Sequence, residues 1–564
     1  MNRLFIASLA GTLGLAGLAS ADEIVVTEDI STSVTWTADN TYNLQNQIYV
    51  LPGASLTIEK GTTIASTPSA NGAGSLAVCR GAKIFALGTA DEPITMTSTA
   101  DNGTWREACN EWGNLTVMGN AYVSNSFESG NTATFGNNQS PMEGLVEEFP
   151  GDPKVVYGGV DDDDNSGALA YLSIRYGGRV VGLANELNGL SLGGIGRGTD
   201  IDHIEIMNNV DDGIEIWGGT VNLNYVNIWN IGDDSFDIDQ GWRGSAQYGL
   251  IVQGFSTDAS QGSGVGDNIC ETDGAENSDA QPVTTAQIAN FTMIGQPDGD
   301  GATAWRDGAR VQYRQCIIMD CGEKVVRPDG DDGDGASGYG HNGTLTLEQV
   351  FNTPATVKGL PNTSTVNAGG IADAGGAAYL YQAQVDGTLA GINDSVLYNN
   401  ANYADFDFYN GDRDNVIEPS NNPIVSIERA APVVRGGKVM TQVIGIDPRA
   451  ATNAAKNANG ANGENGFVEA ASYRGGFAED SVWLCGWSAA DQFGFLTTPA
   501  EFCAVAEPCP ADLNGDGVVS GADVGLLLSA WGPCKGACPA DLNADGTVNG
   551  ADFGLLLSGF GPCG

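Results

Sequence analysis

The chain has 564 residues, of which 70 are acidic and only 24 are basic, so its formal net charge at pH 7 is −46. A surface this acidic repels the phosphates of nucleic acids and of anionic membranes, which excludes both as expected partners. Glycine is frequent, at 80 residues, which favours many tight turns and argues against a mainly helical protein.

The first 21 residues have the pattern of a secretory signal peptide. A basic start at Arg3 precedes an apolar stretch over 4–18, and the small residues 19–21 form a cleavage site. The apolar stretch is too short for a comfortable membrane span, and no later stretch reaches about 18 apolar residues. We therefore expect cleavage after Ala21 and a mature protein that is secreted, either extracellular or on the cell surface, with no membrane span.

Residues 22–505 alternate short apolar pairs with Gly, Asn and Asp turns and show almost no helical periodicity. In the clearest segment, Ile204, Ile206, Ile214 and Ile216 recur 22 residues later as Val226, Ile228, Phe236 and Ile238. A β-sandwich has strands of similar length, but it would not keep one register over successive repeats. The pattern therefore predicts an all-β body built as a parallel β-helix, a solenoid whose coils stack their aliphatic residues.

Two acidic pairs, Asp211-Asp212 and Asp233-Asp234, are separated by the same 22 residues. In coils stacked about 4.8 Å apart they would be close neighbours. Carboxylates this close cannot all ionise cheaply, so some pKa values rise or a cation lies between them. One interpretation is catalytic, because glycosidases use a carboxyl pair whose member of raised pKa is the acid. The other is structural, with aspartates that cap turns in a ladder that is solvated or bridged by calcium.

Two tryptophans flank this ladder and are candidates for stacking on sugar rings. Trp217 and Trp229 each follow an isoleucine with a buried pattern, so we expect both to point outward. Arg243 is the only basic residue near the ladder in the sequence, and His203 has no spacing typical of a catalytic triad. The acidic clusters at 161–164 and 329–335 could hold further calcium ions, with solvated loops as the alternative.

Residues 506–564 contain one unit written twice, and each copy carries the spacing of a calcium-binding loop. Oxygen ligands alternate along a loop of about 12 residues, a glycine at the sixth position makes the sharp turn, and an acidic residue closes the loop. The sequence therefore predicts a small α-helical, EF-hand-like domain with two Ca²⁺ ions. The predicted ligands of the first loop are Asp512, Asn514, Asp516, Val518, Ser520 and Asp523, and those of the second are Asp541, Asn543, Asp545, Thr547, Asn549 and Asp552.

Eleven cysteines in an exported chain favour disulfide bonds over metal thiolates. Four of them belong to the terminal repeats, where two pairings are plausible. A pseudo-twofold arrangement would join Cys534 to Cys538 and Cys509 to Cys563, whereas pairing within each copy would join Cys509 to Cys534 and Cys538 to Cys563. The other seven cysteines are an odd number, so one thiol is expected to be free or intermolecular.

The body resembles large secreted bacterial proteins with a right-handed parallel, pectin-lyase-like β-helix, on the segments 185–194, 211–219, 232–237, 473–477, 483–487 and 493–496. This resemblance implies a fold and export but no particular activity. Residues 509–563 resemble dockerins, the calcium-dependent modules that attach secreted proteins to cohesin partners. Dockerins usually carry Ser or Thr at the tenth and eleventh loop positions, where this chain has Gly521-Ala522 and Gly550-Ala551. The resemblance therefore implies calcium binding, with a partner that is cohesin-like or another surface protein.

These observations predict a secreted protein that binds extracellular polysaccharide or cell-surface material and is attached to a partner through its calcium-dependent tail. The alternative is a polysaccharide hydrolase or lyase with Asp211, Asp212, Asp233 and Asp234 at its centre. A third hypothesis is a structural surface protein or adhesin without a small ligand.

Overall fold

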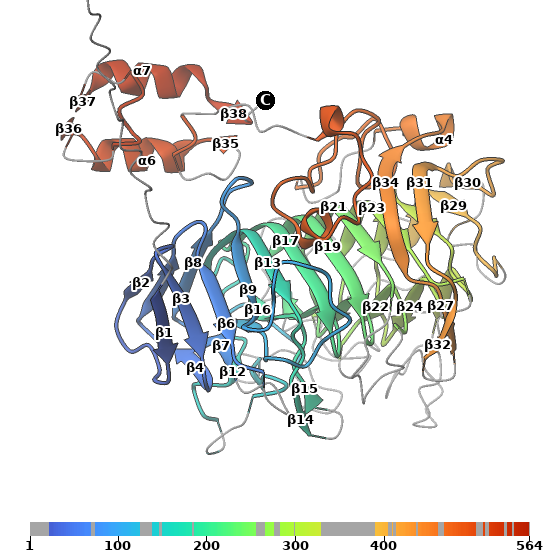
Figure 1. The fold of residues 1–564 in the computed structure, drawn as a ribbon, viewed down its shortest axis with the longest axis horizontal. Coiled ribbons are helices and arrows are strands. Elements are labelled where there is room, and N and C mark those ends of the chain that lie inside the picture. Colours follow the sequence, from blue (N-terminus) through green and yellow to red (C-terminus); the bar gives the residue numbers. More distant parts are fainter. Residues whose placement is uncertain are drawn as a thin grey trace, which may run out of the picture.

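The chain winds as a parallel β-helix whose coils stack from the N-terminal end toward residue 417 (Figure 1). The structure is a computed structural model that describes residues 22–328 and 390–562, apart from gaps at 69–73, 125–137, 146–148, 150, 183–184, 255–265, 276–281, 298, 300, 404–408, 410–412, 436–437, 461–466, 504–510, 514–517, 535–537 and 544–545. The predicted signal peptide over 1–21 lies outside the described residues. Among the helices that the structure describes, none is long and apolar enough to cross a membrane.

One side of the coil is a nine-stranded sheet in which every neighbouring pair is parallel. Along the solenoid its strands are β4 (Gln47–Val50), β7 (Ser75–Val78), β10 (Leu115–Met118), β16 (Leu190–Ile195), β18 (Ile214–Gly219), β20 (Phe236–Asp239), β22 (Cys270–Asp273), β24 (Thr303–Arg306) and β27 (Val326–Pro328).

The rest of the coil is a 17-stranded sheet that bends at a corner into two faces. Its strands are β1 (Asp22–Val26), β2 (Val34–Trp36), β3 (Asn40–Leu44), β5 (Ser55–Ile58), β6 (Thr63–Ser66), β8 (Lys83–Leu87), β9 (Ile94–Ser98), β13 (Gly167–Arg175), β17 (Asp200–Asn209), β19 (Asn222–Ile231), β21 (Ser245–Val252), β23 (Gln287–Ile294), β25 (Gln312–Arg314), β26 (Ile317–Met319), β28 (Gly391–Asn393), β29 (Val396–Tyr398) and β30 (Val416–Ile417). Strand β13 shows the bend, because its first half pairs with β8 and its second half with β9.

The predicted register of the coils is confirmed. Ile204 pairs with Val226 and Ile214 with Phe236; the first column continues back to Leu172 and the second to Leu190. All of these side chains are fully buried in one apolar core that runs along the solenoid. Alternation puts every second residue of a strand inside the coil, so a period of 22 stacks aliphatic residues on aliphatic residues and buries them from water.

The corner inside the long strands carries residues in the left-handed backbone region, which turns the chain from one face to the next. Tyr171, His203, Tyr225 and Tyr248 occupy this position in β13, β17, β19 and β21, with φ between 48° and 61°. Their rings stack on one another, with centroids 4.1, 4.2 and 5.1 Å apart. Since His203 is a member of this stack, its role is in packing.

Coil length varies although the register is kept. The side chain of Asn230 donates a hydrogen bond to Asn208, its equivalent 22 residues earlier. In a later coil the backbone N–H of Cys316 donates to Ser395, which is 79 residues away in sequence. Extra residues leave the coil at its corners, for example as the antiparallel pairs β11 (Ser140–Pro141) with β12 (Val156–Tyr157) and β14 (Val180–Gly182) with β15 (Asn185–Glu186).

Residues 424–503 leave the coil and cover one side of it (Figure 1). They form the antiparallel pairs β31 (Ile424–Arg429) with β34 (Val443–Ala450) and β32 (Val433–Arg435) with β33 (Lys438–Met440), then α4 (Asn453–Lys456), α5 (Ala489–Gln492) and a 3-10 turn (Ala500–Phe502). The fully buried carboxylate of Glu205 ties this covering segment to β17, because it accepts hydrogen bonds from the backbone N–H groups of Ala489 (2.6 Å) and Ala490 (3.0 Å). A disulfide bond joins Cys485 to Cys503 within the covering segment.

The two C-terminal repeats fold as a unit in which each copy supplies one helix (Figure 1). Helix α6 (Gly521–Ser529) follows β35 (Val518–Val519), and α7 (Gly550–Ser558) follows β37 (Thr547–Val548). The short strands pair between the copies, β35 with β38 (Gly561–Pro562) and β37 with β36 (Gly532–Pro533). A disulfide bond joins Cys534 to Cys538, so the pseudo-twofold pairing is confirmed for this bond and pairing within each copy is wrong. Cys509 and Cys563 lie outside the described residues.

Candidate functional site

Acidic side chains from three successive coils meet on the outer face of the nine-stranded sheet. The register places Glu215 of β18 beside Asp237 of β20, and Asp237 beside Glu271 of β22. Their neighbours in sequence, such as Ile214 and Ile216, point into the core, so alternation directs these three carboxylates outward. We call this column, together with the acidic turns that precede its strands, the acidic site.

The predicted ladder forms the second part of the acidic site. Asp211-Asp212 and Asp233-Asp234 lie in the turns before β18 and β20, as the 22-residue spacing predicts. The backbone N–H of Asp234 donates to Asp212 Oδ1 over 2.9 Å, and the N–H of Asn268 in the next coil donates to Asp234 Oδ1. Asp212 and Asp234 are therefore buried acceptors that join one turn to the next, while Asp211 and Asp233 are partly exposed.

Three overlapping groups within the acidic site bring carboxylate oxygens within 4.8 Å of one another, and each group could hold a metal ion. The groups are Asp211 with Asp212 and Asp233, Asp212 with Glu215 and Asp237, and Asp233 with Asp234 and Asp267. All of these donors are oxygen atoms, which is the ligand set that hard cations such as Ca²⁺ prefer over softer transition metals.

Burial and mutual repulsion raise the pKa values of these carboxyls. Burial is the main cause at Asp211, Asp212, Glu215 and Asp234, and the charges of neighbouring carboxylates add to it. Burial and the charge of Glu271 likewise raise the pKa of Asp237 to about 7, against the lowering effect of Arg306. The basic side chains of the protein therefore do not balance the negative charge of the acidic site.

Two further contacts bear on whether a cation fits. Asn188 is 1% exposed; its Nδ2 donates to Glu215, and its Oδ1 has no hydrogen-bond partner among the described residues. An additional oxygen ligand is thereby available at the edge of the group around Asp212. On the far side, Arg306 forms ion pairs with Glu271 (2.8 Å) and Asp273 (2.7 Å), which neutralises one end of the column. The residues present fit a divalent cation at the other end.

Arg243, the basic residue expected beside the ladder, is engaged elsewhere. Its guanidinium forms two hydrogen bonds of 2.6 Å with the carboxylate of Asp162, and both side chains are buried. The basic residue that does reach the acidic site is Arg306, which the sequence reasoning missed together with Glu215, Asp237, Asp267, Glu271 and Asp273. For Glu215 and Asp237 the available signal was the 22-residue period combined with the outward positions of each strand. The later residues follow longer coils, which that period does not reach.

The family of the body follows from a sequence comparison. A family model described as a pectate-lyase-like beta-helix domain matches residues 28–375. The chain belongs to the pectate-lyase-like β-helix family. Neither the curated proteins nor the solved structures include a match to this chain. The acidic site lies within the residues that the family model matches, and the two C-terminal repeats at 509–563 lie beyond them.

The expectation that Trp217 and Trp229 form an exposed sugar-stacking face is wrong. Both side chains point away from the central core of the β-helix, as alternation predicts, but other segments cover them. Trp217 is 5% exposed and lies against Tyr157 of β12, with ring centroids 6.2 Å apart. Trp229 is fully buried and stacks on Phe495 of the covering segment, with centroids 5.2 Å apart. Neither ring is available to a glycan.

The described part of the two predicted calcium-binding loops shows how their closing aspartates are held. Asp523 accepts hydrogen bonds from the N–H groups of Ser520 and Leu513, and Asp552 accepts from those of Asn549 and Asn543. Each closing aspartate is also the third residue of the helix and completes a capping box with the N-cap residue, Ser520 in α6 and Asn549 in α7. Backbone hydrogen bonds lower the pKa of Asp552, so this carboxylate is ionised at neutral pH. The predicted ligands Asn514, Asp516 and Asp545 lie outside the described residues.

Proposed function

We propose that this β-helix protein binds an acidic polysaccharide outside the cell through a divalent cation, most simply Ca²⁺, held in the acidic site. The fold of its family supports a polysaccharide-related role. The observation that carries the proposal is the concentration of carboxylates over three coils, with oxygens within 4.8 Å and raised pKa values. A cation would relieve their repulsion and would leave coordination positions for the carboxylates of a polysaccharide.

The partly exposed members of the site are the ones that reach the solvent side. Asp211 and Asp233 share one group of ligand atoms, and Asp237, the second residue of β20, shares another with Asp212 and Glu215. Asp212 and Asp234 would coordinate the cation from its buried side. Each also accepts a hydrogen bond from a backbone N–H of the next turn. We therefore assign Asp211, Asp233 and Asp237 to cation binding, and Asp212 and Asp234 to binding and positioning together.

The test is binding of the full chain to polygalacturonate, with and without calcium. Asp233→Asn is expected to reduce calcium-dependent retention at least tenfold, because it removes one charge from two of the three groups. The matched control is Asp39→Asn, which makes the same charge change on an exposed turn. Retention that is unaffected by removal of calcium, or is lost equally in both variants, would contradict the proposal.

A second candidate function is cleavage of the same polysaccharide. It is favoured by Asp237, whose pKa of about 7 would let this carboxyl give up or take up a proton near neutral pH. A retaining glycosidase needs two carboxyl groups about 5–5.5 Å apart, which is comparable with the spacing in this site. Release of oligosaccharides from polygalacturonate by the wild type and not by Asp237→Asn would select cleavage, and binding without release would select the first function.

Export and attachment complete the proposal. The chain would leave the cell with the segment 1–21 as its signal, and its dockerin-like tail would bind a cohesin-like or other surface protein when two Ca²⁺ ions are present. The support is the duplicated loop spacing and the closing aspartates at 523 and 552. Immobilised tail-containing protein should capture its partner from the cell surface in calcium, and EGTA should release it.

A further inference from the structure

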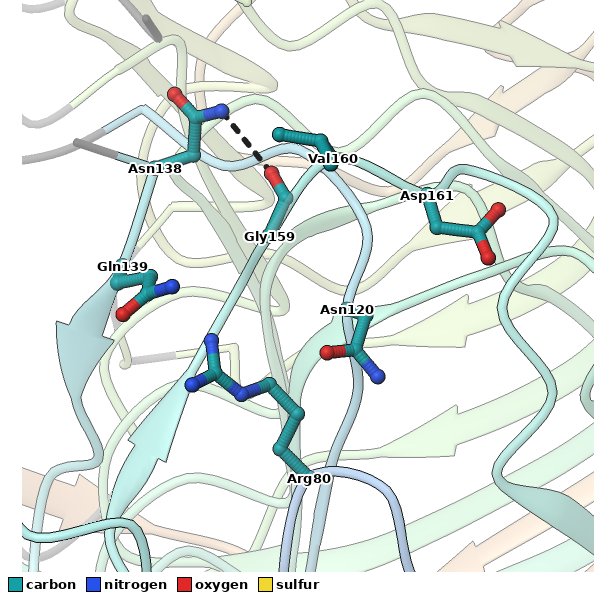
Figure 2. Close-up of a pocket in the computed structure, with 7 residues that line it drawn as sticks. All are labelled: Arg80, Asn120, Asn138, Gln139, Gly159, Val160 and Asp161. Carbon is teal, nitrogen blue, oxygen red and sulfur yellow. Dashed lines mark hydrogen bonds between the residues drawn. The ribbon is translucent and has the colours of Figure 1, made fainter. Parts of the chain in front are cut away.

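A polar pocket of about 660 Å³ lies beside the nine-stranded sheet, at the end of the strands opposite to the acidic turns (Figure 2). It is built from the turn after β7, the turn after β10, the residues before β11 and the segment after β12. Its side chains offer one guanidinium, three amides and one carboxylate; they belong to Arg80, Asn120, Asn138, Gln139 and Asp161.

The guanidinium of Arg80 is the feature that selects a ligand. It is partly buried and donates one hydrogen bond, from Nη1 to the carbonyl of Gly158 over 2.6 Å. Among the residues that the structure describes, none forms an ion pair with Arg80, although the charge of Asp164 acts on its guanidinium from beyond ion-pair distance. The chain has 70 acidic and only 24 basic residues, so an arginine without an ion pair stands out. The other N–H groups of its planar guanidinium can donate to the two oxygens of a bound anion.

The walls of the pocket are held by contacts of their own. Asn138 is 1% exposed, and its Nδ2 donates to the carbonyl of Gly159 over 3.0 Å (Figure 2). Its Oδ1 has no hydrogen-bond partner among the described residues. Asn120 Nδ2 donates to Asp164 over 2.9 Å. A Cβ on Gly159 would lie 2.5 Å from the carbonyl oxygen of Asn120, so the backbone segments are packed in contact and the pocket is preformed.

We propose that this pocket binds one uronic acid residue of an acidic polysaccharide, with the sugar carboxylate on Arg80 and the hydroxyl groups on the amides and on Asp161. The volume suits a small ligand, and amides together with a carboxylate both donate to and accept from sugar hydroxyls. This assignment rests on the proposed polysaccharide function and deepens it, because it adds a contact that needs no cation and lies apart from the acidic site.

The experiment is calorimetric titration of trigalacturonate into the full-length protein in EGTA, so that calcium-bridged binding is switched off. The wild type is expected to bind, the neutral galactose trisaccharide to bind at least tenfold more weakly, and Arg80→Gln to lose at least tenfold in affinity for the acidic sugar. Gln139→Ala, at the exposed rim, should lose a smaller factor without affecting the fold. Arg197→Gln is the matched control, because it removes the same charge from an exposed ion pair with Asp163.

The outcomes separate this inference from the proposed function. No binding of trigalacturonate in EGTA, equal binding of the neutral trisaccharide, or unchanged binding by both Arg80→Gln and Gln139→Ala would overturn the pocket assignment. Each of these results is compatible with calcium-dependent retention of polygalacturonate at the acidic site. Conversely, binding in EGTA that depends on Arg80, without any calcium-dependent retention, would support the pocket and overturn the proposed role of the acidic site.

Discussion

Replacement of Asp237 by Asn should make the protein more stable when metal is absent. The change removes one charge from the middle of the column between Glu215 and Glu271 and keeps the side-chain shape. The pKa of this carboxyl is about 7 in the folded protein, against about 3.9 for an unfolded chain. The folded state therefore holds the proton more tightly, so the stability contributed by the protonated carboxyl is complete below about pH 4 and is lost as the pH rises to about 7.

The size of the effect follows from that pKa. The difference from the unfolded value corresponds to about 4 kcal/mol in the free energy of unfolding above pH 7. Because the carboxylate is partly exposed and solvent screens its neighbours, we expect about 2 kcal/mol to be measurable. In metal-free buffer at about pH 8, Asp237→Asn should exceed the wild type by this amount, and the difference should vanish at about pH 4. In millimolar calcium the wild type should gain more than the variant.

Urea unfolding followed by tryptophan fluorescence gives these differences, and thermal midpoints at a fixed heating rate replace it if unfolding is irreversible. Asp39→Asn serves as the control, because its carboxylate lies on an exposed turn. Both proteins carry the same C-terminal repeats, so the comparison cancels their response to calcium. If Asp237→Asn is less stable than the wild type by the same amount at every pH, or calcium stabilises both equally, the electrostatic account of the site is wrong.

Three other substitutions and one alkylation measurement test separate parts of the structure. Glu205→Ala should lower the free energy of unfolding by about 3 kcal/mol and expose the covering segment to protease, because two buried N–H groups lose their acceptor. Trp229→Ala should cost about 3–5 kcal/mol in urea unfolding without changing polysaccharide retention; a selective loss of retention would restore its predicted sugar-binding role. Burial raises the pKa of Cys316 to about 12, so mass spectrometry should find it unalkylated at about pH 8 until urea is added. Asp552→Ala should reduce the calcium-dependent helical circular dichroism, because α7 loses the acidic half of its capping box together with a predicted ligand.

The body of the fold was predictable because its period is strict where the coils are short. Ile204 and Ile214 recur after 22 residues with aliphatic or aromatic partners, and stacking in register is the only arrangement that buries all of them. The same period found the acidic turns. It could not find Glu271, because an insertion between β20 and β22 breaks the period, although the register of the sheet is kept.

The error over the tryptophans has a different cause. Alternation along β18 and β19 correctly directs Trp217 and Trp229 out of the coil, but alternation is a local rule and says nothing of what lies above the sheet. Tyr157 and Phe495 cover them, and these residues are distant in sequence from the strands that they cover. A local pattern therefore predicts the direction of a side chain, and only tertiary structure decides whether solvent reaches it.

The unequal length of the coils has a consequence for how such a protein can change. The core constrains only the residues that stack between neighbouring strands, and a coil can grow from 22 to 79 residues between equivalent positions without shifting that stack. An insertion at a corner therefore leaves the packing of the core unchanged, and its cost to the free energy of folding is the modest entropy of closing a longer loop. New surfaces can be added to one coil while the carboxylate column on its neighbours keeps its spacing, so the surface of one coil is free to diverge while its neighbours keep theirs.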